Sequence, residues 1–135
     1  MPVTCTHLAI HARDVERAAD FYRRYAGLKE IHRRRDGSTT VVWLAEPERG
    51  SQGTVVVLLS AEHADAVAPA PLAHIGYAVD RREDVDRIAA MAEREGILVE
   101  PARDAGPIVG YFCIVCDPDG NAVEFSHGQS LGPST

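Results

Sequence analysis

The chain has 135 residues, of which 45% are hydrophobic and 25% charged, a composition typical of one soluble globular domain. A formal net charge of −6 argues against binding to nucleic-acid phosphates as the main role. The apolar runs are much shorter than the roughly 20 residues of a membrane-spanning helix, and residues 1–5 lack the basic and apolar parts of a signal peptide. The three cysteines are an odd number, so we expect reduced thiols and a cytoplasmic location.

The first half of the sequence predicts a strand, a helix and three further strands. The first strand begins near His7, and the helix follows with Asp14 as its N-cap and apolar residues every three or four positions. Gly27 stands where the end of a helix favours a left-handed residue. We expect the three further strands at 28–35, 38–45 and 54–60, with a hairpin turn at 36–37 between the first two.

The second half predicts the same order after a linker at 61–72 that contains two prolines. A strand begins at His74, a helix ends near Gly96, and strands follow at 97–102, 111–116 and 121–127. Each half has about 60 residues, which is a marginal size for an independent core. We therefore expect one domain over 1–135, in which module one (about 3–60) and module two (about 73–127) complete each other, followed by a tail at 128–135.

The two halves align without gaps at four positions of chemical interest. The offset that carries His7 onto His74 also carries Val57 onto Glu124, so three of the four positions hold side chains that bind metals. Because alternate residues of a strand face opposite sides, each of the three shares its face with small residues, namely Ala9, Gly76, Ala122 and Ser126. A single strand histidine is more often a hydrogen-bonded core residue, and a single glutamate is usually solvated. The coincidence of three such positions favours a metal site instead.

The doubled β-α-β-β-β order, the histidine that opens each half and the segment Asp-Pro-Asp-Gly-Asn-Ala-Val-Glu-Phe at 117–125 together resemble the vicinal oxygen chelate superfamily. The resemblance extends over about 3–127. The superfamily includes glyoxalase I, extradiol dioxygenases, fosfomycin-resistance thiol transferases and bleomycin-resistance proteins. It implies an α+β fold in which two paired β-α-β-β-β modules form a cup-shaped, mostly antiparallel sheet.

The resemblance also implies a function. His7, His74 and Glu124 match the positions of the family's metal ligands and would hold one divalent ion, with Fe, Mn, Zn and Ni all compatible with this ligand set. A small-molecule substrate would chelate the ion through two neighbouring oxygen atoms. Because family members are commonly dimers, we expect a homodimer. Such a protein would be a metal-dependent enzyme of the glyoxalase or dioxygenase type.

Departures from the family pattern leave the reaction open between dioxygenation and a lyase or transferase reaction. Val57 occupies the position of the fourth, carboxylate or amide, ligand of glyoxalase I, which disfavours that activity. Ile114 replaces a tyrosine of the extradiol dioxygenase signature, and Lys29 is the only lysine available for the cation site of fosfomycin-modifying members. The alternative to an enzyme is a protein that sequesters a small molecule without catalysis, as bleomycin-resistance proteins do. A further alternative is a family member whose metal site is vestigial.

Four residues are candidates for the substrate pocket: His11, Trp43, Val57 and Tyr111. His11 shares a strand face with His7, although a partly exposed position at the strand end is the simpler interpretation. Trp43 and Tyr111 lie on predicted strands and would either line the cup or belong to the core. The arginines at 33–35 are interpreted as a solvated hairpin tip, with an anion clamp as the alternative.

Overall fold

The structure of the protein is a computed structural model that describes residues 2–62 and 73–131. The chain divides into two compact units, 1–66 and 67–135. The division falls inside the segment 61–72 that the sequence predicts as a linker. Residues 63–72 of that segment, and residues 132–135 of the expected tail, lie outside the described residues.

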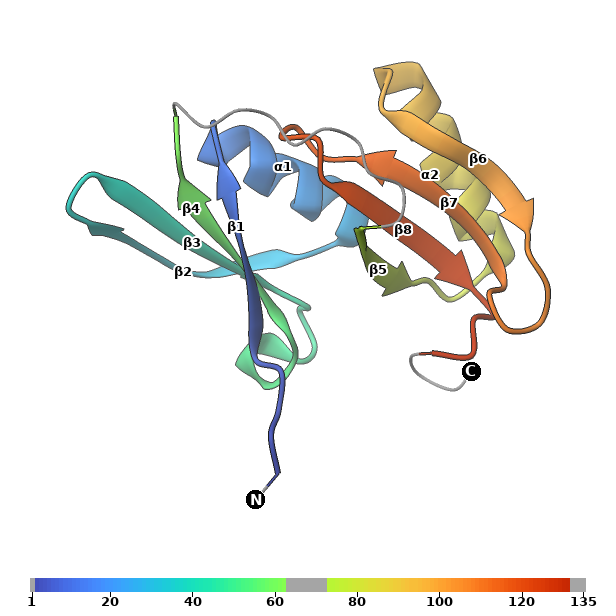
Figure 1. The fold of residues 1–135 in the computed structure, drawn as a ribbon, viewed down its shortest axis with the longest axis horizontal. Coiled ribbons are helices and arrows are strands. Elements are labelled where there is room, and N and C mark those ends of the chain that lie inside the picture. The colour runs from blue at the N-terminus through green and yellow to red at the C-terminus, as the bar shows by residue number, and fades with distance from the viewer. Residues whose placement is uncertain (1, 63–72, 132–135) are drawn as a thin grey trace. The chain divides into compact units, whose positions relative to one another are not determined.

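Within the described residues, each unit contains one α-helix and four strands, whose arrangement Figure 1 shows. Unit 1 consists of β1 (His7–Ala12), α1 (Val15–Ala26), β2 (Lys29–Asp36), β3 (Thr39–Ala45), the short 3-10 helix η1 (Gly50–Gln52) and β4 (Val55–Ser60). Unit 2 consists of β5 (His74–Ala78), α2 (Arg82–Glu95), β6 (Leu98–Asp104), β7 (Tyr111–Cys116) and β8 (Ala122–His127). The α+β class and the doubled β-α-β-β-β order are therefore confirmed.

The two sheets have the same topology and the same register. Their strand orders are β1-β4-β3-β2 and β5-β8-β7-β6, in which β1–β4 and β5–β8 are parallel and the other pairs antiparallel. Ala9 pairs with Val57 in unit 1, and Gly76 pairs with Glu124 at the equivalent place in unit 2. The alignment of the two halves predicted from the sequence thus holds residue by residue in the strand ladders.

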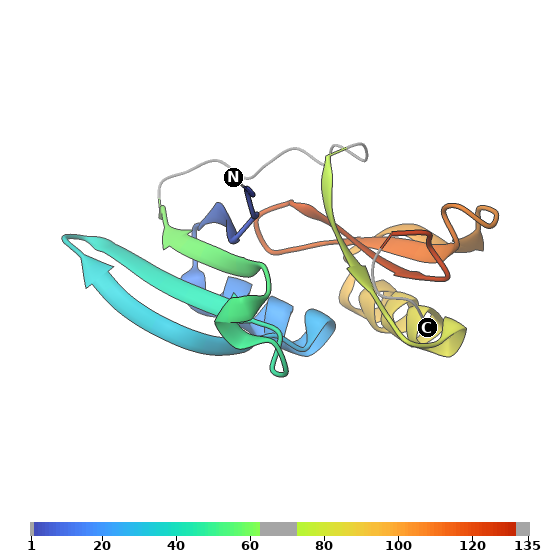
Figure 2. The ribbon, with the colours of Figure 1, turned by 90° about the horizontal axis from the view of Figure 1, so that it is seen from below.

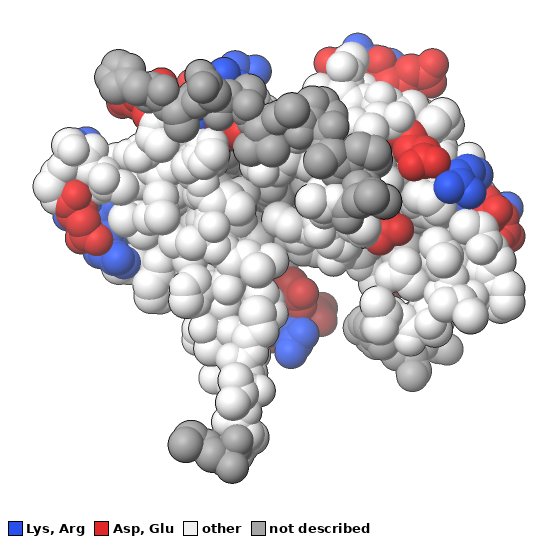
Figure 3. Space-filling view, in the orientation of Figure 1, with Lys and Arg blue, Asp and Glu red and all other residues white. Residues whose placement is uncertain are grey.

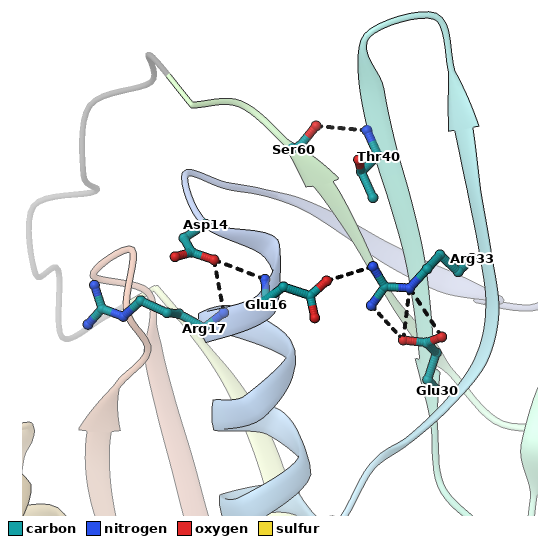
Figure 4. Close-up of polar contacts among 7 residues, drawn as sticks. All are labelled: Asp14, Glu16, Arg17, Glu30, Arg33, Thr40 and Ser60. Carbon is teal, nitrogen blue, oxygen red and sulfur yellow. Dashed lines mark hydrogen bonds and ion pairs between the residues drawn. The ribbon is translucent and has the colours of Figure 1, made fainter.

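Helix α1 begins and ends at the predicted residues. The Asp14 carboxylate accepts hydrogen bonds from the backbone N–H groups of Glu16 and Arg17, at 3.1 and 3.2 Å (Figure 4), and satisfies donors that the first turn leaves free. Gly27 ends the helix with φ = 67°, which costs glycine little because it has no Cβ. Arg33 of β2 donates to Glu16 and Glu30, and this contact holds the start of α1 beside β2 (Figure 4).

One face of each sheet is covered by the helix of the same unit (Figures 1 and 2), and we call this the helix face. In unit 1, Arg33 reaches Glu16 of α1 and pairs with Val42, so Val42 lies on the helix face. In unit 2, the thiol of Cys113 donates to the backbone oxygen of Val85 in α2. We call the opposite face of each sheet the distal face.

The distal face of unit 1 is mostly apolar. Its buried side chains come from β3 and β4, with partly buried Trp43 and Leu59 beside them: Val41, Ala45, Val55 and Val57. In unit 2 the distal face carries Phe112, Ile114 and Ala122. These clusters are the surfaces on which the polar residues of interest lie.

The Asp-Pro-Asp-Gly turn positions the start of β8. The Asp117 carboxylate accepts hydrogen bonds from the backbone N–H groups of Asp119 and Asn121, both at 2.9 Å, and from the side-chain amide of Asn121. Asp117 and Asp119 are 3% and 2% exposed. The motif therefore has a structural role here, because it fixes the strand that carries Glu124. Neither α-helix of the described residues has the length and apolar composition needed to cross a membrane.

Candidate metal and substrate site

His74 and Glu124 lie together on the distal face of unit 2. Their strands β5 and β8 are parallel neighbours, and the distance from His74 Nε2 to Glu124 Oε2 is 3.6 Å. Two ligands bound to one metal at 2.0–2.2 Å lie about 2.8–3.6 Å apart in octahedral or tetrahedral geometry, so the observed distance is at the upper end of this range. A small adjustment of either side chain would therefore bring both atoms to ligand distance.

The surroundings of Glu124 leave its carboxylate available. Glu124 is only 7% exposed, yet no residue of the described ranges donates a hydrogen bond to it. Its oxygen atoms keep some access to solvent, because neither is among the fully buried polar atoms that lack a partner in the described residues. An ion bound between Glu124 and His74 would compensate this charge, so the donor set fits a divalent cation.

Gly76 provides the space beside this carboxylate. It pairs with Glu124 in the β5–β8 ladder, and a Cβ atom built on Gly76 would lie 3.2 Å from Glu124 Oε2. That distance is shorter than an ordinary van der Waals contact. The absence of a side chain at this position therefore permits the observed place of the carboxylate.

The equivalent place in unit 1 holds His7 and Val57. His7 Nδ1 lies 2.9 Å from the hydroxyl oxygen of Thr6, a contact that leaves Nε2 for a ligand, since the partner of one ring nitrogen sets the role of the other. Val57 is 8% exposed and has no ligating atom. Within the described ranges, no set of three His, Cys, Asp or Glu side chains forms a complete metal site. The structure thus brings together His74 and Glu124 but places His7 in the other unit.

A hollow of about 310 Å³ lies on the distal face of unit 1, next to His7. It is lined by Thr6, His7, Arg34, Trp43, Ser51, Val55 and Val57. Two of the four residues that the sequence suggested for a pocket, Trp43 and Val57, therefore line the same hollow as a candidate metal ligand.

The other two candidates lie elsewhere. His11 is partly buried on β1, and its Nε2 atom is buried without a hydrogen-bond partner among the described residues, but it does not line the hollow. Tyr111 is on the helix face of unit 2: its hydroxyl donates to Asp86 of α2, and Arg82 lies 3.8 Å from the ring centroid. Tyr111 thus packs against the helix, which corrects the expectation that it lines a substrate pocket.

Two residues of β2 that the sequence did not single out individually lie at or beside the hollow. Arg34 lines it, and His32 packs on Trp43 with 4.6 Å between the ring centroids. His32 pairs with Trp43 and Arg34 with Val41, whereas Arg33 points to α1. Strand alternation predicts that Arg33 and Arg34 face opposite sides of the sheet. It does not predict which of them shares a face with Trp43, because the register of the β2–β3 pair shifts between Glu30 and His32.

A second hollow, of about 360 Å³, lies beside the start of α1 and is lined in part by Asp14, Glu16, Arg33 and Ser60. Figure 4 shows these groups bonded within the protein. Asp14 caps α1, Glu16 binds Arg33, and Ser60 accepts a hydrogen bond from the Thr40 backbone N–H at 2.8 Å. Their polar atoms serve the fold, so we do not regard this hollow as a functional site.

Comparisons with known proteins agree with the architecture. The family model described as Glyoxalase/Bleomycin resistance protein/Dioxygenase superfamily matches residues 4–125. The uncharacterized protein PA2024 of Pseudomonas aeruginosa is 40% identical over 135 residues, which are 100% of this chain and 96% of that protein.

Solved structures are similar in fold. One is a glyoxylase/bleomycin resistance protein/dioxygenase domain from Frankia sp. EAN1pec, with a TM-score of 0.76 and 20% identity over 96% of this chain and 100% of that one. Another is a mutant of the genomically encoded fosfomycin resistance protein FosX from Listeria monocytogenes, complexed with Mn(II) and 1S,2S-dihydroxypropylphosphonic acid. Its TM-score is 0.74, with 18% identity over 97% of this chain and 96% of that one.

Proposed function

Because this chain belongs to the Glyoxalase/Bleomycin resistance protein/Dioxygenase superfamily, we propose that it is a metal-dependent enzyme whose small substrate binds the metal through two neighbouring oxygen atoms. The observation that carries the proposal is the pair formed by His74 and Glu124, in which a buried carboxylate without hydrogen-bond donors among the described residues lies 3.6 Å from an imidazole nitrogen.

His74, Glu124 and His7 are the proposed ligands. His74 would bind through Nε2, the atom that lies near Glu124. His7 would bind through Nε2 because Thr6 engages Nδ1. His7 would come from the same chain or from a second copy, since the superfamily resemblance also favours a homodimer. Light scattering at micromolar concentration tests the dimer, and a monomer would contradict it.

Two imidazoles and one carboxylate leave coordination positions open for a substrate. A divalent ion bound there would supply Lewis-acid stabilisation of a substrate oxygen that gains negative charge. The protein's own contribution is to fix the three ligands on strands, to supply an apolar wall at Val55 and Val57, and to keep room beside Glu124 at Gly76. The FosX neighbour contains Mn(II), so Mn is the first ion to test.

The residue at position 57 argues against the glyoxalase I reaction. That isomerisation requires a base near the substrate carbon as well as an electrophilic metal. Val57 pairs with Ala9 as Glu124 pairs with Gly76, and this equivalence supports our proposal that the repeat lacks a second carboxylate at position 57. We therefore propose dioxygenation, or addition to an activated substrate, in place of lactoylglutathione formation.

Metal analysis tests the proposal. Protein purified without chelator should contain about one divalent ion per chain, and the ion identified should then be used to screen substrates with vicinal oxygens. Glu124→Gln should weaken metal binding at least tenfold, while Glu93→Gln, the same change on the exposed surface of α2, should leave it unchanged. Equal metal affinity in both variants would contradict the ligand assignment. Ligand binding without turnover by protein loaded with the identified ion would indicate the sequestering alternative.

A further inference from the structure

We propose that the hollow on the distal face of unit 1 selects organic anions, with Arg34 binding the carboxylate or phosphonate group and Trp43 contacting the apolar part of the molecule. This inference rests on the proposed function only in identifying the anion as the substrate. It names a charge and a shape that the family resemblance does not specify.

The contacts of Arg34 hold its guanidinium in one orientation. Its Nε donates to both carboxylate oxygens of Asp36, each at 3.1 Å. Its Nη1 lies 3.0 Å from Nε2 of His32, and because arginine only donates, the imidazole nitrogen is the acceptor. Among the described residues, no acceptor binds Nη2. Both N–H groups of Nη2 thus remain for an oxyanion.

Trp43 forms the wall against which the rest of the ligand would pack. The guanidinium carbon of Arg34 lies 5.8 Å from the centroid of the Trp43 ring, and His32 packs on the same ring. Val55 and Val57 continue the apolar surface. A volume of about 310 Å³ is at the lower end of small-molecule sites, so the ligand is a small molecule with a flat or compact apolar part.

The charge of the hollow favours an anion. Of the described residues that line it, Arg34 carries the one permanent charge, and no lining residue is acidic. Figure 3 shows charged side chains at the tip of the β2–β3 hairpin and an uncharged surface over β1 and β4. The Asp36 carboxylate binds Arg34 through Nε, so it leaves the N–H groups of Nη2 to an oxyanion.

The experiment uses Trp43, the single tryptophan of the chain, as the reporter. Metal-free protein is titrated with phenylphosphonate, phenylacetate and the neutral analogue phenylacetamide, and binding is read from tryptophan fluorescence. We expect at least one of the two anions to bind at least tenfold more tightly than the amide, and a difference between them identifies the preferred oxyanion. Arg34→Gln should reduce the preference to less than about threefold, whereas Arg34→Lys should retain part of it.

Arg35→Gln is the matched control, because Arg35 is the next arginine of β2 and does not line the hollow. It should keep the full preference for anions. Equal binding of anions and amide, an unchanged preference in Arg34→Gln, or no binding of any of the three would overturn the inference. Because this titration contains no metal, its outcome does not depend on whether His7, His74 and Glu124 bind an ion. A failure of the metal-binding test refutes the proposed function. A failure of the anion titration refutes only this inference.

Discussion

Replacing Gly76 with alanine should weaken metal binding without weakening the fold. The new Cβ would lie 3.2 Å from Glu124 Oε2, so the carboxylate must move by a few tenths of an ångström. Metal–ligand distances tolerate deviations of about 0.2 Å, and changes beside a ligand typically cost 10–100-fold in affinity. We expect about a tenfold loss, which corresponds to about 1.4 kcal/mol.

The expected effect on folding has the opposite sign. Gly76 lies inside β5 and has no positive φ, and alanine is more favourable than glycine inside a strand by roughly 0.5–1 kcal/mol. The free energy of unfolding of the metal-free variant should therefore be equal to or higher than that of the wild type. A general packing defect would instead lower both the metal affinity and the free energy of unfolding.

Calorimetric titration of chelator-treated protein with Mn²⁺ measures the affinity, and urea unfolding in the presence of chelator measures the stability. Gly53→Ala serves as the control, because Gly53 also lacks a positive φ and its new Cβ would lie 3.3 Å from Arg49, far along the chain from Glu124. Wild-type metal affinity in Gly76→Ala would refute the idea that Glu124 binds the ion in the position seen here.

Val57→Glu should confer lactoylglutathione formation from the methylglyoxal–glutathione adduct, because it adds a carboxylate at the fourth repeat position; robust activity of the wild type in the same assay would contradict our interpretation of Val57. Gly110→Ala should lower the free energy of unfolding by about 2–4 kcal/mol, since Gly110 has φ = 83° and a new Cβ would lie 2.5 Å from the His127 backbone oxygen; a change below about 0.5 kcal/mol in urea unfolding would refute this. Burial raises the pKa of Cys113 to about 12, with further contributions from nearby acidic charges, so at pH 8 the thiol stays protonated and an alkylating reagent should modify exposed Cys5 but not Cys113. Equal labelling of both cysteines, mapped by mass spectrometry, would contradict the burial.

Local signals in the sequence predicted most of the fold. Asp14 and Gly27 mark the ends of α1, and the structure places caps at both. The alignment of His7 with His74 predicted the register that brings Glu124 beside His74. These features depend on short-range preferences and on strand alternation, both of which one sequence displays.

The features that the sequence did not predict depend on contacts across strands. Tyr111 faces α2 because of its position opposite His127 in the β7–β8 ladder and its bond to Asp86, and the sequence does not specify that register. The place of Arg34 beside Trp43 follows a register shift within the β2–β3 pair. Such shifts reverse which side chains share a face, and only the paired strands reveal them.

A crystal structure determined from crystals of the protein grown with Mn²⁺ would test the central claim most directly. We predict one ion with His7 Nε2, His74 Nε2 and a Glu124 carboxylate oxygen as ligands, each at about 2.0–2.3 Å, with His7 supplied by the same chain or by a second copy. An ion bound elsewhere, or His7, His74 and Glu124 directed to three separate places, would contradict the account.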